Sequence, residues 1–267
     1  MGAVPTVDVN GTRLYYERAG TGPRLLFLNG SGATLATSRP LVEAFTGGFD
    51  VVAHDQRGLG RSRLAPGPYA MADYAEDALG LLDRVGWPTC RVVGISFGGM
   101  VAQEVAVTAP ARVERLALVC TSPGGAGGSS YPLHELAELS DTARAQVWRR
   151  LLDTRFTDAW LADHPDDRAL LDMLGARHAG AESEAVRRGE RDQLEARRGH
   201  DVWDRLGRIA CPTLVAGGRF DALAPPANSQ ALAGRIPGAA LRLYEGGHAF
   251  LAQDRRALPD VLAFLAA

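Results

Sequence analysis

The sequence predicts an α/β protein with a mostly parallel, doubly wound sheet that begins with an antiparallel hairpin. Three observations support this prediction. Two alternating segments flank Asn10-Gly11, a dipeptide typical of a tight hairpin turn. Several continuous apolar runs follow, as strands covered on both faces require. Helix-like stretches separate most of these runs, and such alternation is typical of a parallel sheet with helices on both faces.

The expected elements follow the chain in order. The hairpin pairs residues 4–9 with residues 12–18. Apolar runs then predict strands at 25–29, 49–55, 90–95, 115–120, 213–218 and 240–244. Helices are expected at roughly 69–86, 97–109, 226–236 and 254–266.

The alternation breaks once, after Cys120. The stretch TSPGGAGGSSYP is too rich in glycine and serine for regular structure and predicts a hinge. The expected hinge residues are Gly124, Gly125, Gly127 and Gly128. Residues 133–205 are then polar, arginine-rich and helical in period. We therefore expect a core of residues 1–123 and 206–267, with a helical insertion at 124–205 that covers the site as a lid.

Composition restricts the classes of function. The chain is 46% hydrophobic and 22% charged with a net charge of −2, so nothing attracts nucleic acid or an anionic membrane globally. It contains no lysine, which excludes Schiff-base and phosphate-loop lysine chemistry. No signal peptide, membrane span or metal-ligand cysteine spacing is visible, so we expect a cytoplasmic protein without a metal. The expected partner is a small-molecule substrate, and the oligomeric state, a homodimer included, stays open.

Gly94-Ile95-Ser96-Phe97-Gly98 fits the pattern G-x-S-x-G between an expected strand and an expected helix. In this motif a serine occupies a sharp turn whose close approaches leave room only for glycine on either side. The turn exposes the serine hydroxyl as a nucleophile. It also puts the Phe97 N–H at a helix N-terminus, where negative charge is stabilised.

A serine nucleophile needs a base and an orienting acid, expected in the chain order serine, acid, histidine. Asp221 follows one late strand and His248 follows the last, and both lie at the sheet edge where ligands bind. Asp55 and Glu245 compete as the acid. Asp55 is less favoured because it lies in a stretch typical of a structural loop. Glu245 is less favoured because its short tether to His248 leaves little room to align with the imidazole.

The segments LLFLNGSG, DQRGLGRS, GISFGGMVAQ, CPTLVAGGRFDALAPP and EGGH, in this order, resemble the α/β-hydrolase superfamily over nearly the whole chain. Within it, the chain resembles the 3-oxoadipate enol-lactonases and their carboxylesterase relatives. The resemblance implies an eight-stranded sheet, a cap after Cys120 and a catalytic triad. The triad residues would be Ser96, Asp221 and His248.

The resemblance also implies further site residues. The N–H groups of Phe97 and Ser31 would form the oxyanion hole, although this chain has Asn29-Gly30 where many members have His-Gly. Thr154-Arg155 stand where the lactonases tend to have an Arg-Trp pair. The candidate substrate-binding residues are Asn29, Gly30, Phe250, Trp148 and Arg155.

The implied reaction is hydrolysis of an ester or lactone through an acyl-enzyme, without a cofactor. Alternatives on the same triad are carbon–carbon bond hydrolysis, perhydrolysis and a non-enzymatic ligand receptor. The insertion's arginines occur as adjacent pairs among acidic residues, a pattern typical of a solvated helical face. The pairs are Arg149-Arg150, Arg187-Arg188 and Arg197-Arg198. We therefore expect a mainly apolar pocket that prefers neutral substrates.

Overall fold

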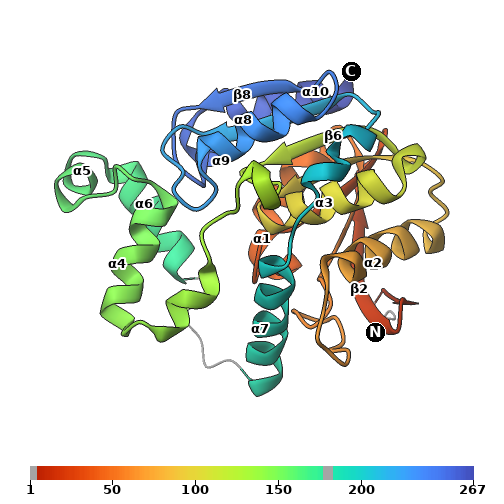
Figure 1. Cartoon of the computed structure of the whole chain (residues 1–267), viewed down its shortest axis with the longest axis horizontal. Coiled ribbons are helices and arrows are strands. Elements are labelled where there is room, and N and C mark those ends of the chain that lie inside the picture. Colours follow the sequence, from red (N-terminus) through yellow and green to blue (C-terminus); the bar gives the residue numbers. More distant parts are fainter. Residues whose placement is uncertain (1–4, 177–182) are drawn as a thin grey trace.

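The computed structural model describes residues 5–176 and 183–267. Its centre is an eight-stranded sheet in the order β1-β2-β4-β3-β5-β6-β7-β8 (Figure 1). The strands are β1 (Thr6–Val9), β2 (Thr12–Ala19), β3 (Arg24–Leu28), β4 (Asp50–His54), β5 (Cys90–Ile95), β6 (Val113–Val119), β7 (Thr213–Gly218) and β8 (Ala240–Tyr244). Only the β1–β2 and β2–β4 pairs are antiparallel. The predicted fold class is confirmed.

Helices cover both faces of the sheet. They are α1 (Leu35–Thr46), α2 (Met71–Arg84), α3 (Phe97–Thr108), α8 (Pro226–Arg235), α9 (Phe250–Gln253) and α10 (Ala257–Ala266). Side chains of α2, α3 and α8 pack in one apolar cluster, and those of α1, α9 and α10 pack in the other. Strand β3 serves both clusters, because Leu26 faces the first while Leu25 and Phe27 face the second. This is why its sequence is an uninterrupted apolar run.

The segment between β6 and β7, which we call the cap (residues 124–205), contains four α-helices in its described part. They are α4 (Asp141–Leu152), α5 (Asp158–Asp163), α6 (Pro165–Ala176) and α7 (Glu184–Arg198). In Figure 1, α4, α5 and α6 form a group to one side, whereas α7 stands apart from them. The ends of the cap meet, since Gly124 bridges Asp201 and Val202 N donates to Pro123 O at 3.0 Å. No helix in the described residues is both long and apolar enough to cross a bilayer.

Candidate active site

Ser96 lies in a strained turn between β5 and α3. Its φ is 54° and its ψ is −114°, a backbone conformation that residues other than glycine rarely adopt. A Cβ at Gly94 would overlap the carbonyl group of Gly98, and one at Gly98 would overlap Leu28 O. The two glycines of the motif therefore permit the close approach of three chain segments beneath the serine.

The structure brings Ser96, Asp221 and His248 together in a chain of hydrogen bonds. The Ser96 Oγ lies 3.0 Å from His248 Nε2, and His248 Nδ1 lies 2.8 Å from Asp221 Oδ2. The other oxygen of Asp221 accepts from the backbone N–H groups of Leu223 and Ala224, each at 2.8 Å. These bonds fix the carboxylate, which in turn orients the imidazole toward the serine.

The environment of His248 favours its protonated form. The histidine is 13% exposed and the Asp221 side chain is fully buried. Burial lowers the pKa of His248, but the charge and hydrogen bond of Asp221, together with Cys120, more than offset this effect and hold the pKa well above its ordinary value. The pair is therefore built to receive a proton from Ser96 and to stabilise the resulting imidazolium.

The two competing acids have other roles. Asp55 accepts from Leu35 N at 2.6 Å and from Arg61 N at 2.8 Å, so its carboxylate closes its own loop. Glu245 forms an exposed ion pair with Arg219 at 3.2 Å. Neither carboxylate contacts the His248 ring in the described structure.

The expected oxyanion hole consists of the Phe97 N–H and the loop at residues 29–32. Phe97 is the first residue of α3, so its N–H lies at the positive end of the helix. Asn29 is buried and its carbonyl oxygen accepts from Gln56 Nε2 at 2.8 Å. The Asn29 Nδ2 and Ser31 Oγ are buried without a hydrogen-bond partner among the described residues. Unpaired donors of this kind are available to a ligand.

Gln193 of α7, which sequence reasoning missed, holds this loop from the cap. Its Oε1 accepts from Gly32 N at 2.8 Å and its Nε2 donates to Gln56 Oε1 at 2.6 Å. Gln56 in turn bonds Asn29, so one buried amide ties the cap to both ends of the loop. No pattern in the neighbouring sequence marks Gln193. It lies in an arginine-rich helix, and which face of that helix is buried depends on the segments that pack against it.

A second part of the cap holds the loops that carry the acid and the base. Leu151 O accepts from Ala222 N and Leu223 N, and Leu152 O accepts from His248 N at 2.6 Å. A Cβ at Gly247 would overlap Leu152 O, which explains the glycine before the histidine. The end of α4 is therefore part of the framework of the triad.

Three of the predicted substrate-binding residues make packing or ion-pair contacts within the protein itself. Arg155 pairs with the fully buried Asp153 at 2.7 Å and lies over the rings of Trp160 and Phe220. Phe250 is fully buried and stacks on Tyr244, so its ring belongs to the core and is no pocket wall. Trp148 packs, half-buried, between the two apolar clusters of the cap. The burial of Phe250 corrects the sequence-based expectation, whereas the roles of Arg155 and Trp148 stay predictions.

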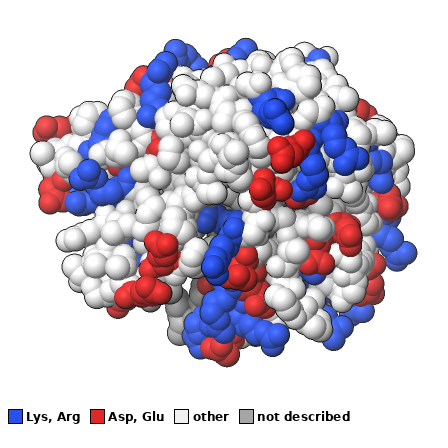
Figure 2. Space-filling view, in the orientation of Figure 1, with Lys and Arg blue, Asp and Glu red and all other residues white. Residues whose placement is uncertain are grey.

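The cap arginines differ from one another. Figure 2 shows acidic and basic side chains interspersed on the face in view. Arg198 is exposed and pairs with Glu195, as a solvated face predicts. Arg197 is only 7% exposed, and for this residue the expectation of a solvated face is wrong. Among residues 5–176 and 183–267, no group of three or more metal-ligating side chains is placed to hold a metal ion.

The chain is similar to known proteins over nearly its whole length. A family model described as the alpha/beta hydrolase fold matches residues 23–254. RutD of Variovorax paradoxus (strain S110), a protein named for carbamate hydrolysis, is 35% identical over 265 residues, covering 95% of this chain and 97% of that protein. A poly(3-hydroxyalkanoate) depolymerase of Ectopseudomonas oleovorans is 31% identical over 244 residues, covering 90% and 83%. The solved enol-lactonase of Burkholderia xenovorans LB400 is 27% identical with a TM-score of 0.79, covering 98% of this chain and all of that one.

Proposed function

The chain belongs to the alpha/beta hydrolase fold family and is a hydrolase, and from that premise we propose that it is a serine hydrolase of carboxylic esters or lactones. The observation that carries the proposal is the continuous hydrogen-bonded chain from Ser96 through His248 to Asp221. Such a chain activates an otherwise weak hydroxyl nucleophile.

In the first half-reaction, Ser96 Oγ bonds to the substrate carbonyl carbon while His248 Nε2 takes the hydroxyl proton. The carbonyl oxygen becomes an oxyanion that faces the Phe97 and Ser31 N–H groups. Each such donor contributes roughly 3–4 kcal/mol in comparable sites. The bond to the leaving oxygen then breaks, and His248 gives its proton to the departing alcohol.

In the second half-reaction, water replaces the alcohol. His248 takes a proton from the water while the water oxygen bonds to the acyl carbon. The bond to Ser96 Oγ then breaks, the serine regains its proton from His248, and the carboxylic acid leaves. Asp221 remains ionised throughout and stabilises the charged imidazole.

The relatives support an acyl substrate but differ in its kind. The depolymerase and the enol-lactonase favour an ester or lactone. The similarity to RutD favours a second candidate, a carbamate, whose carbonyl meets the same nucleophile. A panel of p-nitrophenyl esters, lactones, carbamates and vinylogous diketones separates these substrates and the carbon–carbon alternative, and peroxide added to the ester assay tests perhydrolysis.

The decisive test removes the nucleophile and the base. Ser96→Ala and His248→Ala should each lower kcat by roughly 10⁴-fold or more, and the double variant should be scarcely worse because the residues act as a unit. His164→Ala, an exposed histidine of the cap, should keep full activity. Wild-type-like turnover by folded Ser96→Ala would refute the proposal, and a wild type inactive on the whole panel would favour a ligand receptor.

A further inference from the structure

Arg197 of α7 is a buried cation that has no counter-ion among the described residues. Its Nη1 donates to Tyr131 O at 2.8 Å and its Nη2 donates to Ser130 Oγ at 2.6 Å, while its Nε has no partner. No carboxylate in the described residues forms an ion pair with it. Both of its partners are neutral, so the charge itself is uncompensated.

Arg57 shows how unusual this is within the same protein. Arg57 is equally buried, yet it pairs with the buried Asp77 at 2.7 Å. Burying a charge without such a partner is costly, because the lost hydration is not replaced. Burial lowers the pKa of Arg197 to about 10, so the guanidinium still carries its charge near neutral pH.

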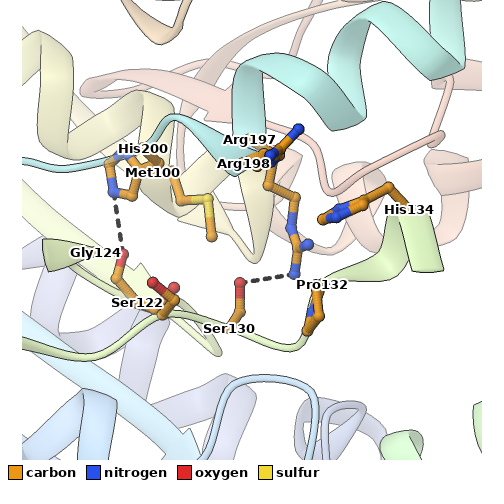
Figure 3. Close-up of a pocket in the computed structure, with 10 residues that line it drawn as sticks. Met100, Ser122, Gly124, Ser130, Pro132, His134, Arg197, Arg198 and His200 are labelled. Carbon is orange, nitrogen blue, oxygen red and sulfur yellow. Dashed lines mark hydrogen bonds between the residues drawn. The ribbon is translucent and has the colours of Figure 1, made fainter.

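A cavity of about 270 Å³ lies beside Arg197, between α7 and the segment that follows β6 (Figure 3). It is lined by Met100, Ser122, Gly124, Ser129, Ser130, Pro132, His134, Arg197, Arg198 and His200, with no carboxylate among them. The buried Ser122 Oγ has no hydrogen-bond partner in the described structure. His200 lies 3.1 Å from Ser122 O through its Nε2, and burial lowers the pKa of His200 to about 4, so it adds no charge.

We propose that this cavity binds a carboxylate group, held by the free donors of Arg197 and by Ser122 Oγ. A guanidinium has five N–H donors in a planar fork that suits a carboxylate, and the protein uses only two of the three donor nitrogens here. The cavity has room for the carboxylate and a short chain attached to it. A bound carboxylate would supply the counter-ion that Arg197 lacks.

The carboxylate has two possible sources, the far end of a substrate or a free acid. Met100 lines the cavity and follows Ser96 by one turn of α3, which is about 6 Å along the helix. The substrate version rests on the proposed function, whereas the binding of a free acid does not. The substrate version differs from the sequence-based expectation of a mainly apolar pocket that prefers neutral substrates.

The first experiment measures binding by calorimetry at constant ionic strength, with glutarate as the probe and glutaramide as its neutral match. Wild type should bind glutarate and not glutaramide. Arg197→Gln should weaken glutarate binding tenfold or more. Ser122→Ala should weaken it threefold or more without disturbing the fold, because Ser122 Oγ has no hydrogen-bond partner among the described residues. Arg191→Gln removes an exposed charge from the same helix and should bind glutarate like wild type.

The second experiment compares kcat/KM for the p-nitrophenyl monoester of glutaric acid with that for p-nitrophenyl pentanoate. Wild type is compared with Arg197→Gln by the ratio of the two kcat/KM values. If wild type prefers the acid ester and Arg197→Gln lowers that preference tenfold or more, the bound carboxylate belongs to the substrate. If Arg197→Gln loses glutarate binding but keeps the ester preference of wild type, the bound carboxylate comes from a free acid.

The proposal is overturned if wild type does not bind glutarate and Arg197→Gln leaves the ester preference unchanged. Arg197 would then serve only to hold residues 130 and 131. Should Arg197→Gln fail to fold, Ser122→Ala decides in the same two assays, and its wild-type behaviour in both overturns the proposal. Failure of both esters to react would count against the proposed function alone, since the calorimetry does not depend on turnover.

Discussion

At the scale of single residues, the charge of Asp221 decides the protonation of His248. The carboxylate is buried, accepts two backbone N–H bonds and faces the imidazole at 2.8 Å. A charge fixed in this way raises the pKa of the histidine despite burial, which alone would lower it. In the proposed mechanism the neutral imidazole is the base, so activity requires a pH above that pKa.

The pH dependence of kcat/KM should reflect this raised pKa. Activity should be present above the pKa of His248 and be lost as the pH falls through it. An unperturbed histidine would give a midpoint of about 6–7. The structure predicts a midpoint above that range, measured with a neutral ester whose own charge does not change.

Asp221→Asn is the matched variant for this prediction. It should lower the midpoint, because the amide no longer stabilises the imidazolium, and it should lower kcat by roughly 10⁴-fold. An unchanged midpoint in Asp221→Asn would show that another group controls the acidic limb of the profile.

At the scale of elements, α7 contacts the core at two places and the first residues of the cap at a third. Gly189 packs directly on the backbone of Gly58, Gln193 bonds Gly32 and Gln56, and Arg197 bonds residues 130 and 131. These residues are spaced four apart, so they lie on one face of the helix. We expect that face to hold in place the loop at residues 29–32, which we call the oxyanion loop.

Gln193→Ala should loosen the oxyanion loop. It leaves Gly32 N and Gln56 Oε1 without their partner, so we expect kcat to fall roughly tenfold, about 1.4 kcal/mol, with a smaller change in KM for a small ester. Glu195→Ala, an exposed change on the same helix, should leave both parameters unchanged. A loss of thermal stability with unaltered kcat would assign Gln193 a structural role only.

Two glycine-to-alanine changes test the packing of α7. At Gly189 a Cβ would overlap Gly58 O, so Gly189→Ala should force the helix away and destabilise the protein by about 1–3 kcal/mol. At Gly175 of α6 a Cβ meets no described atom within 4 Å, so Gly175→Ala should be neutral or stabilise by about 0.4–1 kcal/mol. Denaturant unfolding measures both, and similar effects of the two changes would contradict the close contact.

At the scale of the whole molecule, the cap is bonded to the loops that carry the proposed active site. The end of α4 bonds the loops of Asp221 and His248, and α7 bonds the oxyanion loop. The two apolar clusters of the sheet consist almost entirely of core residues, and Ala196 and Val202 of the cap pack into the first of them.

Replacing residues 129–199 with a short Gly-Ser linker should therefore leave the core folded, because Gly124 and Asp201 already meet. The turnover of even a small neutral ester should still fall about 100-fold or more, equal to about 2.7 kcal/mol. Circular dichroism reports the sheet and ester hydrolysis reports the site. Full turnover with altered selectivity would restrict the cap to the role of a lid.

The sequence predicted the strands and the triad because each depends on a local pattern. Buried strands need apolar runs, and Ser96 needs Gly94 and Gly98 beside it. Helix α1 was missed, since Pro40 lies inside it and Thr34, which caps its start, gives only a weak signal. The roles of Gln193 and Arg197 were missed for a different reason: the face that a polar helix buries is decided by what packs on it.

The clamp of α4 on the loops of Asp221 and His248 also bears on how the protein folds. The bond from Ser96 to His248 joins residues 152 apart in the sequence, and Leu152 stands between them as the contact that holds the histidine loop. Closing contacts of such long range costs chain entropy, as does the pairing of Leu116 with Thr213 inside the sheet. Turnover needs the sheet and the α4 contacts together, so we expect it to return no earlier than the sheet during refolding.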